Sequence, residues 1–171
     1  MLSLFHSTHL DGLTALLAIA VLLGACQSDT TEGDQQDKMM LPEGKLAVED
    51  PWVRPASRGD STTLYMTVAN GKSTADTLLG AQQAPAYDSV QIFALPDTAE
   101  GMAQAQPVDS LIIPAKTRVT LVPDSAYLML DGLGQSLKEG GEPFLVTVEF
   151  AQSGLQQVQA SVRTSPPSEE Q

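Results

Sequence analysis

The residue types that most often bind metals or act as nucleophiles are scarce in this chain. Its 171 residues include two histidines, His6 and His9, and one cysteine, Cys26. Zn(II) and Cu(II) sites in proteins are usually built from imidazole and thiolate ligands. Beyond residue 26 the chain therefore cannot supply a site of that usual kind, and it offers no thiol nucleophile.

The remaining soft ligands are thioether sulfurs, which favour Cu(I). Met66 alternates with polar residues in a strand-like segment, so we expect it in the core. Met39 and Met40 lie in an acidic linker, where they are ordinary linker residues or, alternatively, a paired-Met handle for Cu(I). Met129 and Met102 are the candidate metal ligands.

Catalytic motifs are absent from the sequence. It contains no G-x-S-x-G, P-loop, G-x-G-x-x-G or H-E-x-x-H pattern. The acid pairs Glu139 with Glu142 and Asp97 with Glu100 lie in turn-like segments, where carboxylates are normally solvated. We expect no enzymatic activity.

The charge balance is strongly acidic. Nine Lys and Arg residues stand against 21 Asp and Glu residues, for a net charge of −12 at pH 7. Nucleic acid and anionic lipid surfaces both recruit basic side chains. The composition therefore argues against either as a partner, and we expect no binding to nucleic acid.

An apolar run near the N-terminus has the size of a signal-peptide core. Residues 13–23 are too few to span a bilayer as a helix. The run ends at Leu23-Gly24-Ala25-Cys26, which resembles a bacterial lipobox, where the cysteine receives lipid and becomes the new N-terminus. The alternative is a buried N-terminal helix with an incidental free cysteine. The polar sequence after Cys26 favours the lipobox, so we expect residues 1–25 to be a lipoprotein signal peptide.

This interpretation fixes a location and one partner. The mature chain would be tied to a lipid bilayer by an acyl anchor on Cys26, in the bacterial cell envelope and facing the periplasm. Gln27, in place of Asp, favours the outer membrane by resemblance to lipoprotein sorting rules. Both histidines would leave with the signal peptide, and the thioether to lipid would consume the only thiol.

Polar segments frame one domain. Residues 26–45 are acidic and predict a flexible tether, and residues 164–171 predict a short disordered tail. Between them, residues 46–163 alternate apolar and polar positions, as half-buried strands do. The clearest cases are residues 64–68, 146–150 and 158–162. With no convincing amphipathic helix, about eight to ten short strands predict an all-β, antiparallel sandwich.

Four segments agree in order and spacing with one known family. They are DPWVRP (50–55), LYMTVAN (64–70), YDSVQIF (87–93) and PDSAYLMLDGL (123–133). Together they resemble the periplasmic copper chaperones called PCu(A)C, over residues 46–163. The resemblance implies a cupredoxin-like or Ig-like Greek-key β-sandwich. It also implies delivery of Cu(I) to the copper subunit of a respiratory oxidase or to another copper-handling protein.

The same resemblance implies a Cu(I) site made of His, Met and a His-x-Met pair. In this chain the first His position falls on Phe93, the first Met position on Ala105 and the second His position on Tyr127. Met129 alone keeps the family's residue type. Met102 lies three residues before Ala105 and reaches the site if the loop register differs.

We therefore expect a family member with a degenerate metal site and weak or absent Cu(I) binding. Phe93, Tyr127 and Met129 would form a packed apolar cluster that replaces the metal or contacts another protein. The leading interpretation is a cell-envelope lipoprotein of the copper chaperone family. The alternative is a non-metal protein-binding or scaffolding module, and a weaker one is a sandwich of another family.

Overall fold

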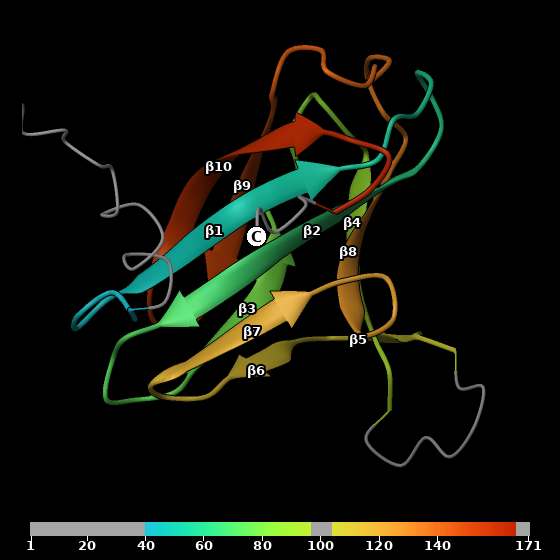
Figure 1. Ribbon diagram of the computed structural model, residues 1–171. Helices are drawn as coiled ribbons and strands as arrows, with labels where there is room; N and C mark the ends of the chain where they lie inside the picture. Colours follow the sequence, from blue (N-terminus) through green and yellow to red (C-terminus); the bar gives the residue numbers. More distant parts are fainter. Residues whose placement is uncertain (1–39, 97–103, 167–171) are drawn as a thin grey trace, which may run out of the picture. The chain divides into compact units, whose positions relative to one another are not determined.

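The computed structural model describes residues 40–96 and 104–166, and every regular element in these ranges is a strand (Figure 1). Cys26, Met102 and residues 167–171 lie outside the described residues. No helix in the described ranges is long and apolar enough to cross a membrane. The strands are β1 (Leu46–Val53), β2 (Thr62–Asn70), β3 (Asp76–Ala81), β4 (Ser89–Ala94), β5 (Gln106–Val108), β6 (Leu111–Ile113), β7 (Thr117–Leu121), β8 (Ala126–Asp131), β9 (Phe144–Phe150) and β10 (Gly154–Val162).

The strands follow one hydrogen-bonded path in the order β5-β4-β8-β2-β1-β10-β9-β3-β6, with β7 paired to the end of β2. Because β5 and β6 are consecutive in the chain yet end the path on opposite sides, the sheet closes nearly onto itself. The all-β prediction is confirmed. One pair, β1 with β10, is parallel, so the sheet is mixed and not wholly antiparallel. These are the first and last strands, and the long path between them permits a parallel alignment.

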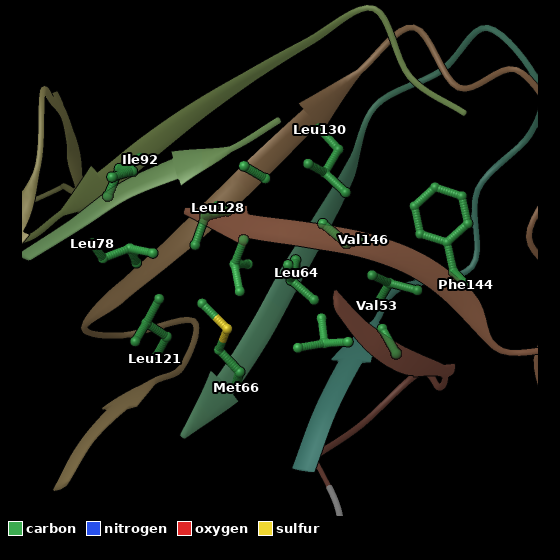
Figure 2. Close-up of a cluster of buried hydrophobic side chains, with 14 of the residues drawn as sticks. Val53, Leu64, Met66, Leu78, Ile92, Leu121, Leu128, Leu130, Phe144 and Val146 are labelled. Carbon is green, nitrogen blue, oxygen red and sulfur yellow. The ribbon is translucent and has the colours of Figure 1, made fainter. Parts of the chain in front are cut away.

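The core lies between the two halves of this folded sheet. Strand β8 shows the alternation clearly, since Leu128 and Leu130 are fully buried whereas Tyr127 and Met129 are half-buried. Figure 2 shows the inward side chains gathered in one cluster. Met66 is in this cluster, opposite Leu121 of β7, as its sequence position predicts.

One buried carboxylate ties β3 to the turn between β9 and β10. Asp76 Oδ2 accepts hydrogen bonds from Ser153 Oγ at 2.6 Å and Lys72 Nζ at 3.1 Å. Its Oδ1 accepts from the backbone N–H groups of Gln152 at 2.9 Å and Thr77 at 2.8 Å. Burial alone would raise the pKa of Asp76, but these hydrogen bonds outweigh it and lower the pKa from 3.8 to about 2.

A pH-dependent loss of stability follows from this carboxylate. Because the pKa is lower in the folded chain than in the unfolded one, the stabilisation is complete above pH 3.8 and is lost as pH falls towards about 2. Asp76→Asn should lower the free energy of unfolding at neutral pH by about 2 kcal/mol. Urea denaturation near pH 7 and near pH 2.5 measures it, with exposed Asp109→Asn as the control. An equal loss at both pH values would contradict the prediction.

Candidate functional site

The residues at the family's metal positions meet on the outer face of β2, β8 and β4. Phe93 of β4 lies directly opposite Tyr127 of β8. Met129, two residues further along β8, is flanked by Gln91 on β4 and Thr63 on β2. Their strand neighbours point into the core, so these side chains point away from it. Phe93, Tyr127 and Met129 therefore share one face of the sheet.

Four aromatic rings form a continuous row across this face. The rings of Phe93 and Tyr127 stack with their centroids 5.3 Å apart and their planes 9° from parallel. The ring centroids of Tyr127 and Tyr65 of β2 are 6.2 Å apart. The Tyr65 ring in turn stacks on the Trp52 ring of β1, with 4.4 Å between the centroids. We call Trp52, Tyr65, Tyr127 and Phe93 the aromatic row. Phe93 and Tyr127 are half-buried, whereas Trp52 and Tyr65 are each only 3% exposed.

A cation lies over the middle of the row. The guanidinium carbon of Arg54 is 5.9 Å from the centroid of the Tyr65 ring, within cation–π range. Trp52 is buried, but it points to the outer face and does not belong to the main core cluster. The sequence does not predict that Trp52, Tyr65 and Arg54 lie beside Tyr127. Their proximity depends on the pairing of β1 with β2, and no local sequence pattern shows that pairing.

Two shallow cavities flank the row. The larger, of about 420 Å³, is lined by Leu95, Gln104, Ala105, Pro123, Asp124 and Tyr127. The smaller, of about 220 Å³, is lined by Arg54, Pro55, Ser61, Thr62, Thr63 and Met129. The structure thus brings Phe93, Ala105 and Tyr127 together and places Met129 beside them on the same face. Met102 lies outside the described residues.

The donor atoms gathered here do not fit the Cu(I) site that the resemblance implies. Phe93 and Ala105 have no lone pair to donate, and the Tyr127 phenol is a hard oxygen where Cu(I) prefers soft sulfur or imidazole. Met129 contributes a single thioether. Within residues 40–96 and 104–166, no group of three or more His, Cys, Asp or Glu side chains could hold a metal ion.

Comparison with known proteins agrees with the resemblance. A family model described as "Putative lipoprotein LpqE-like" matches residues 46–162. The chain belongs to the LpqE-like family. No curated protein sequence matches this LpqE-like chain.

Solved structures relate this LpqE-like protein to the PCuAC domains. The copper-bound PCuAC domain from PmoF2 is 26% identical, with a TM-score of 0.58 over 72% of this chain and 97% of that one. The apo PCuAC domain from PmoF1 is 28% identical, with a TM-score of 0.57 over 72% and 98%. The Cu(I) form of DR1885 from Deinococcus radiodurans is 27% identical, with a TM-score of 0.52 over 77% and 85%. These matches confirm the predicted membership of the PCuAC copper chaperone family.

Proposed function

We propose that this protein is a lipid-anchored member of the PCuAC family, facing the periplasm from the outer membrane. The apolar run of residues 13–23 and the lipobox ending at Cys26 support this location. The description of the matching family as a lipoprotein family supports it too. Hydrogen bonds from the Gly44 N–H to the Gly71 carbonyl and from Arg118 to the Met40 carbonyl attach residues 40–45 to the domain, so the proposed tether after Cys26 is residues 27–39.

We infer that the domain uses the former metal face to contact a protein partner and does not hold Cu(I) in the family's four-ligand site. One observation carries this inference. The Phe93 and Tyr127 rings stack almost in parallel at the two positions where the family places its histidines. Such a stack contributes about 0.5–1.5 kcal/mol beyond area burial, so it stabilises the sheet without a metal.

The composition of the face also suits a protein contact. Half-buried Phe93 and Tyr127 lie near the exposed Arg54. Aromatic residues and Arg are enriched at interface cores and dominate hot spots. By family resemblance, the partner would be a copper-handling protein such as the copper subunit of a respiratory oxidase. We propose no catalysis at this face.

A second candidate function is Cu(I) delivery in a weaker form. Two of the similar structures contain copper by their names, the PmoF2 domain and Cu(I)-DR1885. In this chain Met129, with Met102, would then be the ligands. A thioether pair selects Cu(I) but supplies half of the family's ligand number.

Site-specific crosslinking in the envelope tests the partner contact. A photoreactive phenylalanine analogue in place of Phe93 should give a discrete adduct in intact cells, because this ring lies half-exposed at the end of the aromatic row. The same analogue at Leu145, which is 49% exposed on β9, is the control. Adding Tyr127→Ala should weaken the adduct formed from position 93. Identical adducts from both positions, or none from position 93, would contradict the proposal.

A further inference from the structure

The smaller cavity beside the aromatic row has an unpaired hydroxyl group in its wall. Thr63 of β2 lines this cavity, and its Oγ1 is buried with no hydrogen-bond partner in the described part of the chain. Buried side-chain hydroxyls are mostly hydrogen-bonded, because an unpaired one has given up its hydration for nothing. An unpaired hydroxyl at a cavity wall therefore points to a ligand with a hydrogen-bonding oxygen.

The same cavity presents a cation. Among the described residues that line it, Arg54 alone is charged. The guanidinium carbon of Arg54 lies 5.9 Å from the centroid of the Tyr65 ring, and this contact orients the planar group. Within residues 40–96 and 104–166 the guanidinium forms no ion pair, whereas that of Arg118 binds Glu49 at 3.0 Å. The N–H donors of Arg54 are therefore available to a ligand.

Strand pairing gathers the cation, the hydroxyl and an apolar wall around one space. The Arg54 N–H donates to the Thr63 carbonyl at 3.3 Å, which holds Arg54 beside the start of β2. Thr63 and Tyr65 are two residues apart on β2, so their side chains share the outer face. Met129 of β8 pairs directly with Thr63 and also lines the cavity. The cavity of about 220 Å³ thus joins a guanidinium, a hydroxyl and a thioether.

The other two hydroxyls of the lining are already used within the fold. Thr62 Oγ1 donates to the Arg54 carbonyl at 2.7 Å, and Ser61 Oγ donates to Asp131 Oδ1. Asp131 itself does not line the cavity. Among the described lining residues, Thr63 therefore supplies the hydroxyl that can donate to a ligand.

These groups match the chemistry of a carboxylate. A planar guanidinium binds a planar carboxylate through parallel N–H···O bonds, and a hydroxyl can donate to either oxygen. The Met129 thioether and the Pro55 ring offer apolar contact to the carbon atoms next to the carboxylate. A phosphate dianion fits less well, since Arg54 is the only cation among the described lining residues.

We propose that Arg54 and Thr63 form a binding site for one carboxylate group, with Met129 and Pro55 against its carbon atoms. An Asp or Glu side chain of a protein, or a free small acid, supplies the carboxylate. The site does not rest on the proposed partner contact, because a free carboxylate tests it in the purified chain.

NMR titration of the chain with acetate tests the site directly. At constant ionic strength set by chloride, the Met129 methyl and Arg54 Nε–H resonances should shift together and saturate, with a Kd in the millimolar range. Acetamide has the same shape without the charge and should shift neither resonance. Shifts that do not saturate below about 100 mM acetate would overturn the proposal.

Variants assign the affinity to the two polar groups, with the Met129 methyl as the readout. Arg54→Gln should weaken acetate binding about tenfold or more, because it removes charge-assisted hydrogen bonds. Thr63→Val keeps the side-chain shape and should weaken binding about threefold. The matched control, Arg58→Gln, removes the same charge from an exposed position of the same loop and should change the affinity less than about twofold. Equal losses in Arg54→Gln and Arg58→Gln would overturn the site.

A second ligand distinguishes the two sources of the carboxylate. Tighter binding of N-acetylglutamate amide than of acetate would support a protein side chain, and the reverse order would support a free acid. Binding of neither would overturn the site. Saturable acetate binding without a crosslink from position 93 would keep this site and contradict the proposed partner contact.

Discussion

Phe93→His, Ala105→Met and Tyr127→His together are expected to create tight one-to-one Cu(I) binding. Phe93 and Tyr127 face each other across β4 and β8 with their rings 5.3 Å apart, so two imidazoles would converge there. Ala105 lines the cavity beside Tyr127, and Met129 is already on the same face. We expect an affinity gain of about a thousandfold or more, equivalent to about 4 kcal/mol. Competition against a chromophoric Cu(I) chelator measures it.

The matched control adds the same residue types to the opposite half of the sheet. Ile112→His, Leu145→Met and Leu155→His replace exposed side chains of β6, β9 and β10. This variant gains the same number of imidazoles and thioethers without bringing them together. If the restored variant folds but binds no more tightly than this control, the assignment of the ligand positions is wrong.

Cys26→Ala is expected to abolish lipid attachment completely. Cys26 is the only cysteine in the chain, so no other thiol can accept the diacylglycerol. Two acyl chains are needed for stable anchoring, and their loss should release the domain from the membrane once the leader is removed. Labelling with a fatty-acid analogue in cells should give a signal for the wild-type chain and none for the variant.

Gln27→Asp is the control for this experiment. It should keep the lipid label, because the acceptor Cys26 is intact. By the sorting rule that favours the outer membrane for Gln27, it should move the protein to the inner membrane fraction. A persistent label on Cys26→Ala would contradict the lipobox interpretation.

The strands were predictable where their signal is local. Val146, Val148 and Phe150 alternate with polar residues in the sequence, and all three are buried in the structure. Burial of one face imposes this period of two on any half-buried strand, so the pattern can be read without knowing its partner.

The aromatic row was only half predictable, because its other half depends on long-range pairing. Trp52 meets Tyr65 through a register that shifts between Glu49 and Trp52. In this bulge Asp50 has a φ of 47°, an uncommon left-handed conformation for a residue other than Gly. Local alternation is interrupted at such a bulge, so the sequence does not show which face Trp52 occupies. The sequence also does not show the parallel pairing of β1 with β10, because this pairing joins the first and the last strand of the domain.

The family motif placed Phe93 and Tyr127 at the two positions that hold histidine in the family. It did not reveal that the two rings stack in nearly parallel planes, because ring orientation depends on the surrounding side chains. Nor did it reveal that Arg54 lies over Tyr65, since this contact joins residues that no local pattern relates.

Cu(I) competition with the wild-type chain most directly tests the claim that the metal face has become an aromatic contact face. The full chain is titrated under reducing, anaerobic conditions against chelators of graded Cu(I) affinity, with Met129→Ala in parallel. We expect the wild-type chain to withdraw no copper from even the weakest chelator and Met129→Ala to behave identically. Tight one-to-one binding by the wild-type chain, lost in Met129→Ala, would contradict the claim.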